Sequence, residues 1–346
     1  MKKCLFSISI FLLLSWSCSN NNNNIDINST SQPKASYTPS FNADSAYFFV
    51  EQQVNFGPRV PNSAAHQECA NYLINTLQNF VDTVIVQTFT TKAYNGTTLN
   101  GKNIIGCFNK ENPNRILLAA HWDSRPYADN DADIANSRKP IDGANDGASG
   151  VGVLLEIARQ VNIKKLNIGI DIIFFDIEDY GEPNDERHLY TGENWALGSQ
   201  HWAKNPHKHN YQAKYGILLD MVGGKNAHFP KEGTSHFYAA TIQEKIWNNA
   251  SILGYGNRFT KNVSHPITDD HLYVNTIRNI QMVDIIDIDI YSPTGFNPTW
   301  HTINDNMENI DKQNVTQTQN NNTDDILNDV TNNEYKYGFV TDIETD

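Results

Sequence analysis

Hydrophobic and polar positions along the N-terminal part of this chain follow the spacing of helices. Apolar residues recur at helical intervals across 44–54 and again across 64–80, where Leu73 and Leu77 would lie on one face. A break rich in turn-forming residues, 56–63, separates the two stretches. We therefore predict two amphipathic helices at the start of the folded part.

Short apolar runs then alternate with longer stretches of helical character. Alternating β-branched residues are typical of half-buried strands, and continuous apolar runs are typical of strands covered on both faces. We predict strands at 81–90, 102–108, 115–120, 168–175, 215–222 and 281–290, and further helices at 147–160, 196–203 and 239–253. Strands that alternate with helices indicate an α/β fold with a layered sheet flanked by helices.

The two ends of the chain lack this pattern. A basic pair, an apolar run at 4–14 and small residues up to Cys18 are typical of an export signal, and the run is short for a membrane span. The end of this segment resembles a loose lipobox, so we predict lipidation of Cys18, with ordinary cleavage nearby as the alternative. The predicted organisation is a signal peptide with a lipobox-like end at 1–18, a disordered tether at 19–40, one folded domain at 41–315 and a polar tail or weak helix at 316–346.

Composition narrows the classes of function. The chain has 346 residues, 39% of them hydrophobic, which suffices for a sizeable core. The formal net charge of −13 and the lack of any basic cluster argue against a nucleic-acid partner, and we interpret the acidity as an aid to solubility. Cys69 and Cys107 lie in apolar surroundings and would be buried thiols, although an exported protein could also oxidise them to a disulfide.

Acidic and histidine side chains recur just beyond the predicted strands. Each of them alone could be a loop cap or a solvated side chain. In open α/β sheets, however, ligands bind outside the carboxyl ends of the strands, so we expect these side chains to converge. The candidates in this position are His121, Asp123, Asp176, Glu178, Asp179, Asp220 and, one loop beyond the last strand, His301.

Asp146 and the adjacent pair Glu178 and Asp179 carry further information. Asp146 lies where a helix begins, so it would be either the N-cap of that helix or a metal ligand on a glycine-rich turn. Adjacent acids after a strand cannot both point the same way, so one could bind a metal while the other faces the substrate as a base. Carboxylates from two loops together with His301 would give zinc three protein ligands and one open position.

One loop, 296–306, combines this histidine with aromatic residues. Phe296 and Trp300 lie within a few positions of His301. An aromatic wall beside an imidazole excludes water and shapes a small pocket. The sequence therefore predicts a narrow, partly apolar site around the metal.

These residues, in this order, resemble the zinc aminopeptidase and animal-type glutaminyl cyclase superfamily, and within it the glutaminyl cyclases and their bacterial relatives. The Trp immediately before the histidine favours the cyclases. The resemblance runs from about 55 to 310 and includes 56–61, 119–124, 143–146, 174–179, 218–223, 269–271 and 300–302. It implies a three-layer α/β sandwich with a central mixed, mostly parallel, twisted sheet flanked by helices.

The resemblance also implies an activity, a cofactor and a role for each site residue. The activity would be conversion of the N-terminal glutamine of peptides or proteins to pyroglutamate with release of ammonia. We expect a monomer, and the export signal and lipobox-like end predict its location in the bacterial cell envelope. One zinc would act as Lewis acid. The implied residues are Asp146, Asp179 and His301 as zinc ligands, Glu178 as general base and acid, Asp220 and Asp269 as its proton-sharing partners, and Trp195, Phe296 and Trp300 as the pocket.

Two alternatives stay open at this point. A zinc aminopeptidase would use two metals, and His121 with Asp220 could hold the second one, with Asp146 as the bridge. In a cyclase the same residues would form a hydrogen-bond network. A surface lipoprotein that only binds its ligand is the other alternative, and metal content separates all three.

Overall fold

The computed structural model describes residues 41–311. The predicted signal peptide, the lipidation of Cys18 and the tether lie outside the described residues, and so does the predicted tail at 316–346. Among the described residues, no helix is both long and apolar enough to cross a membrane.

The two N-terminal helices form where the apolar spacing predicts them. Helix α1 spans Ala43–Val54, and the side chain of Asn42 caps it by accepting a hydrogen bond from the Ser45 amide. Helix α2 spans Ala64–Gln78 and is capped in the same way by Ser63. Both prediction and structure place the break between them in the turn-rich segment.

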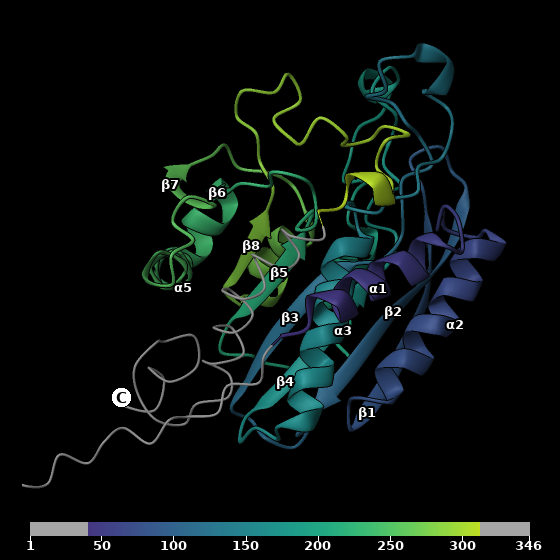
Figure 1. The fold of residues 1–346 in the computed structure, drawn as a ribbon. Coiled ribbons are helices and arrows are strands. Elements are labelled where there is room, and N and C mark those ends of the chain that lie inside the picture. The colour runs from purple at the N-terminus through teal and green to yellow at the C-terminus, as the bar shows by residue number, and fades with distance from the viewer. Residues whose placement is uncertain (1–40, 312–346) are drawn as a thin grey trace, which may run out of the picture. The chain divides into compact units, whose positions relative to one another are not determined.

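A six-stranded sheet forms the centre of the molecule, in the order β1-β2-β4-β3-β5-β8 (Figure 1). Strand β2 pairs antiparallel with both β1 and β4, whereas β4, β3, β5 and β8 run parallel to one another. All residues of the four parallel strands are buried, as their continuous apolar runs predict. The strands are β1 (Thr83–Lys92), β2 (Thr98–Phe108), β3 (Arg115–His121), β4 (Gly169–Phe175), β5 (Gly216–Asp220) and β8 (Met282–Ile286).

Helices cover both faces of this sheet. Helices α1, α2 and α3 (Ala148–Ile163) lie together over one face, where they share a large apolar core with the strands (Figure 1). Gly150 lets α3 approach closely, because a Cβ there would lie 2.1 Å from the Leu219 carbonyl oxygen. Helix α4 (Leu197–Lys204) and the π-helical turn η3 (Val274–Arg278) pack on a second core on the other face. The predicted three-layer α/β sandwich with a mixed, mostly parallel sheet is confirmed.

The segment between β5 and β8 is where the predicted elements differ most from the structure. Helix α5 spans Gly233–Ile252, so it begins earlier than the predicted residue 239, where a kink at Ala239 interrupts it. The side chain of Glu232 accepts two amide hydrogen bonds at the start of α5 and fixes that earlier beginning.

Short elements with little apolar periodicity, inside and outside this segment, were not predicted. They are strands β6 (Phe229–Lys231) and β7 (Phe259–Val263), helix α6 (Asp270–Tyr273), and the 3-10 turns η1 (Ile134–Asn136), η2 (Arg187–Leu189) and η4 (Met307–Asn309).

The two cysteines of the described domain are buried and free. Burial raises the pKa of the Cys69 thiol to about 12. The disulfide alternative is therefore wrong for this structure, and the prediction of two buried thiols is confirmed.

Candidate active site

The predicted site residues converge at the carboxyl ends of the parallel strands. His121 is the last residue of β3 and Asp220 the last of β5, while Glu178 and Asp179 follow β4 by a few residues. His301 arrives from the long segment after β8 and is buried among them. The parallel strands bring these chain segments to one edge of the sheet, as the rule for open α/β sheets predicts.

Asp146, Asp179 and His301 form a group that fits a metal cation. Each offers one ligand atom, and these atoms lie within 4.8 Å of one another in a buried setting. The His301 Nε2 atom is 3.3 Å from Asp179 Oδ1 and 3.6 Å from Asp146 Oδ2. The other Asp179 oxygen, Oδ2, is buried without a hydrogen-bond partner among the described residues. Two buried carboxylates at this distance repel unless a cation or a proton lies between them, and two oxygens with one imidazole suit zinc.

The alternative role of Asp146 as a helix cap is wrong. Gly147 occupies the N-cap position of α3, and no side chain caps that helix. The backbone amides of Asn145 and Asp146 donate instead to the carboxylate of Asp305. The Asp146 side chain is thereby directed toward the two histidines of the site.

His121 and Asp220 extend the group on its other side. The His121 Nε2 atom is 3.0 Å from Asp146 Oδ1 and 3.2 Å from Asp220 Oδ1. Burial alone would lower the pKa of His121, but the nearby carboxylates of Asp123, Asp146 and Asp220 raise it well above its ordinary value. The three residues are in contact, as the hydrogen-bond alternative requires, and their atoms are also close enough to hold the second cation of the other alternative.

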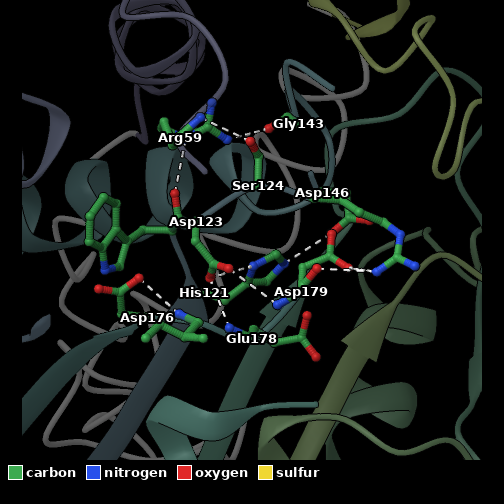
Figure 2. A network of polar contacts seen from close by, with 12 residues as sticks. Arg59, His121, Asp123, Ser124, Gly143, Asp146, Asp176, Glu178 and Asp179 are labelled. Atoms are coloured by element: carbon green, nitrogen blue, oxygen red, sulfur yellow. Dashed lines mark hydrogen bonds and ion pairs between the residues drawn. The ribbon is translucent and has the colours of Figure 1, made fainter. Parts of the chain in front are cut away.

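Asp123 and Asp176, two of the sequence candidates, support the backbone of the site. Asp123 accepts hydrogen bonds from the amides of Glu178 and Asp179, at 3.0 and 3.2 Å (Figure 2). Asp176 binds His66 Nε2 at 2.8 Å and the Lys102 amide at 2.6 Å, so it is held away from the metal-binding group. The segment after β4 therefore contributes three acids with different roles: Asp179 is a candidate metal ligand, Asp176 is structural, and Glu178 is neither.

Glu178 is the free acid. It is 9% exposed and belongs to neither group of potential ligands. Burial raises the pKa of its carboxyl well above the ordinary value; His121 opposes this, and Asp269 and Asp179 reinforce it. A nearly buried carboxyl that neither ligates a metal nor pairs with a base is free to exchange a proton with a bound molecule.

Further acids lie behind Glu178, and the sequence revealed only some of them. Burial raises the pKa of Asp220 to about 7 and also raises that of Asp269, the predicted network acid. Asp284, which lies beside His271 and Asp269, was missed. The sequence could have revealed Asp284, because it is the only charged residue inside the apolar strand β8.

The three predicted aromatic residues lie around His301: two have rings roughly parallel to the imidazole, and the third, Phe296, packs against Trp300. The Trp300 ring stacks on the imidazole at 3.7 Å between centroids, and Phe296 packs against Trp300 at 4.4 Å. Trp195 lies parallel to the imidazole at 6.2 Å. The candidate metal site is therefore bounded by flat apolar rings.

Comparison with known proteins agrees with this geometry. Residues 103–324 match the model of peptidase family M28. This chain belongs to peptidase family M28. The glutaminyl-peptide cyclotransferase of the snake Gloydius blomhoffii is 27% identical over 245 residues, which are 62% of this chain and 61% of that protein.

Solved bacterial structures match over more of the chain. The glutaminyl cyclase of Tannerella forsythia is 54% identical, with a TM-score of 0.81, and the match covers 86% of this chain and all of that one. A Zn-dependent exopeptidase from Parabacteroides distasonis is also 54% identical, with a TM-score of 0.81 and coverage of 84% and 99%. The predicted superfamily and its fold are thus confirmed.

Proposed function

We propose that this chain is a zinc-dependent glutaminyl-peptide cyclotransferase that converts N-terminal glutamine to pyroglutamate. The observation that carries the proposal is the aromatic wall beside His301, where Trp300 stacks on the imidazole, Phe296 packs against Trp300, and Trp195 lies parallel to the imidazole. A flat aromatic wall admits a small planar amide and leaves little room for varied side chains. The relatives that bear the name glutaminyl cyclase support the same activity.

Asp146, Asp179 and His301 would hold a single zinc ion. When bound, zinc would supply a Lewis acid that polarises the side-chain amide of the substrate. The neutral imidazole and the two carboxylates balance the charge of one dication. The zinc-dependent exopeptidase among the structural relatives supports the choice of metal.

The residues of the chain would then position the reactants and move one proton. An N-terminal glutamine carries both its nucleophile, the α-amine, and its electrophile, the side-chain carbonyl carbon. The α-nitrogen bonds to that carbon, and the carbon–nitrogen bond of the amide breaks. Glu178 takes a proton from the α-amine and returns it to the departing nitrogen, which leaves as ammonia. Trp300 and Phe296 hold the side chain folded toward the amine, so orientation contributes much of the acceleration.

A two-zinc aminopeptidase is the second candidate function. The observation that favours it is the group of His121, Asp146 and Asp220, which could hold another cation beside the first. In such a site the two metals would share Asp146 and activate a water molecule for hydrolysis. The aromatic wall opposes this candidate, because a general aminopeptidase must accept many side chains.

Parallel assays on the purified protein test the proposal. One assay follows ammonia release from a short peptide that begins with Gln, and the other follows hydrolysis of chromogenic aminoacyl amides. We expect ammonia release, no amide hydrolysis and one zinc per chain by elemental analysis. Two zinc ions per chain together with hydrolysis of the amides would establish the aminopeptidase instead, and protein without zinc or activity would indicate a binding module.

We also propose that the protein is exported and anchored in the cell envelope through a lipid on Cys18. Replacing Cys18 with Ala is expected to move the protein from the membrane pellet to the soluble fraction of a bacterial host and to abolish incorporation of labelled palmitate. The same change at Cys4, within the apolar run, serves as the control and should leave both readouts intact. A Cys18→Ala protein that still sediments with membranes and carries the label contradicts the anchor.

A further inference from the structure

A buried arginine next to the site contacts several of its parts at once. Arg125 is 0% exposed. It donates two hydrogen bonds to the Asp129 carboxylate, from Nε to Oδ1 at 2.9 Å and from Nη2 to Oδ2 at 2.7 Å. Its Nη1 atom donates to the Asp179 carbonyl oxygen at 3.2 Å and to Asp179 Oδ1 at 3.3 Å, and its Nη2 atom donates to the Glu182 carbonyl oxygen at 3.2 Å. This guanidinium therefore joins a candidate zinc ligand to a second carboxylate.

That second carboxylate faces the other candidate ligand, His301. Asp129 Oδ1 lies 3.3 Å from His301 Nδ1. The contact lacks the angles of a hydrogen bond, but a carboxylate this close favours the imidazole proton on Nδ1. The lone pair of Nε2 is then directed at Asp146 and Asp179, where the cation would bind. The Asn130 amide also donates to the His301 carbonyl oxygen at 3.0 Å. It thereby anchors a backbone whose φ of 56° is unusual for a histidine.

The same guanidinium supports the pocket wall. Arg125 lies over the ring of Trp195 at 4.6 Å from its centroid, within the range of a cation–π interaction. The other side of this wall is fixed by close packing, because a Cβ on Gly181 would lie 2.0 Å from the Trp195 ring. Trp195 in turn runs parallel to His301.

We propose that Arg125 and Asp129 are a positioning pair that orients His301 and Asp179 and thereby sets the affinity of the site for zinc. This proposal rests on the proposed zinc site. Without the negative charge of Asp129, the proton of His301 would no longer be drawn to Nδ1, and the imidazole could turn or take its other tautomer. The freed Arg125 would then face Asp179 alone and compete with the cation for its oxygen.

The chain contains a second pair with nearly the same geometry, remote from the site. Arg115 grips Asp171 with two hydrogen bonds, of 2.5 and 2.8 Å, and both side chains are buried. Arg115 is the first residue of β3, whereas the site lies beyond the last residue of that strand. This pair therefore has the bonding of the proposed positioning pair without its location.

The surroundings of this remote pair do not fit a cation. Cys107 and His207 lie beside Asp171, but the Trp202 indole donates to His207 Nδ1 at 3.1 Å. A neutral imidazole that accepts at Nδ1 carries its proton on Nε2, so it has no lone pair to offer toward the acid. Asp171→Asn is thus a matched control for Asp129→Asn.

The test compares the zinc affinities of the parent chain, Asp129→Asn and Asp171→Asn by competition with a chromophoric chelator. We expect Asp129→Asn to weaken zinc binding about 10- to 100-fold, as loss of an outer carboxylate partner of a ligand histidine does elsewhere. Asp171→Asn should lower the unfolding midpoint and leave zinc affinity unchanged. Activity of Asp129→Asn should recover in part when zinc is raised to saturation, which a role in proton transfer would not allow.

Arg125→Lys tests the other member of the pair and covers the case in which Asp129→Asn does not fold. Lysine keeps the charge but loses the bidentate hydrogen bonds to Asp129 and the stacking on Trp195, so we expect weaker zinc binding in this variant too. Parental zinc affinity in folded Asp129→Asn or Arg125→Lys overturns the positioning role. A parent that binds zinc tightly yet never cyclises a Gln peptide overturns the proposed function alone, because affinity is measured without turnover.

Discussion

Replacing Glu178 with Gln is expected to lower kcat for cyclisation about 10³-fold while zinc stays bound. The amide has nearly the shape of the carboxyl but cannot take the proton of the α-amine. Glu178 is not one of the three side chains that would hold the metal, so the substitution leaves Asp146, Asp179 and His301 in place. Because substrate contacts other than the proton transfer persist, KM should change much less than kcat. Initial rates of ammonia release over a range of peptide concentrations separate kcat from KM.

Glu156→Gln is the matched control for this substitution. Glu156 is also buried, but it lies on α3, where it binds the Asn42 amide and Arg159. The control should lose some stability and keep its rate per folded molecule. Full activity in Glu178→Gln would mean that another group moves the proton, and zinc lost together with activity would place Glu178 among the ligands.

The fold was predictable where hydrophobic spacing alone determines structure. Helices at 44–54 and 64–80 and the buried strands lie within a few residues of their predicted positions, because burial of periodic apolar faces dominates their energetics. The location of the site was predictable for a related reason. Parallel strands bring all their carboxyl ends to one edge, so His121, Glu178 and Asp220 meet without any knowledge of side-chain contacts.

The role of each acid was less predictable, because it depends on partners far away in the sequence. Asp176 and Asp179 lie three positions apart after the same strand, yet His66 holds the first in a structural role and the second faces His301. The close pair of Arg125 and Asp129 resembles an ordinary surface ion pair in sequence. Only the burial of the two side chains and the contact of Arg125 with Asp179 distinguish the pair in the structure. Spacing patterns carry no information of this kind.

Arg59 is the clearest example of such a long-range partner, and replacing it with Met is expected to lower the free energy of unfolding by about 3–5 kcal/mol. Its guanidinium is fully buried and donates to three carbonyl oxygens, those of Trp122, Asp142 and Gly143, at 2.6–2.9 Å. Figure 2 shows Arg59 beside Gly143. Methionine fills much of the space but removes the donors of the Trp122 and Asp142 oxygens, which costs about 1–3 kcal/mol for each unsatisfied group. The Gly143 oxygen keeps the Ala148 amide as a donor. Urea denaturation followed by circular dichroism measures the change.

The position of Arg59 gives this substitution a second consequence. Its bonds tie the end of β3 to the turn that carries Asp146, so the variant should also bind zinc more weakly than the parent. Arg138→Met is the control, because Arg138 is 45% exposed and pairs with Asp185 and Glu186 on the surface. That change should alter stability by no more than about 0.5 kcal/mol. Equal losses in the two variants would contradict a structural role for the buried guanidinium, since exposed and buried arginines would then contribute alike.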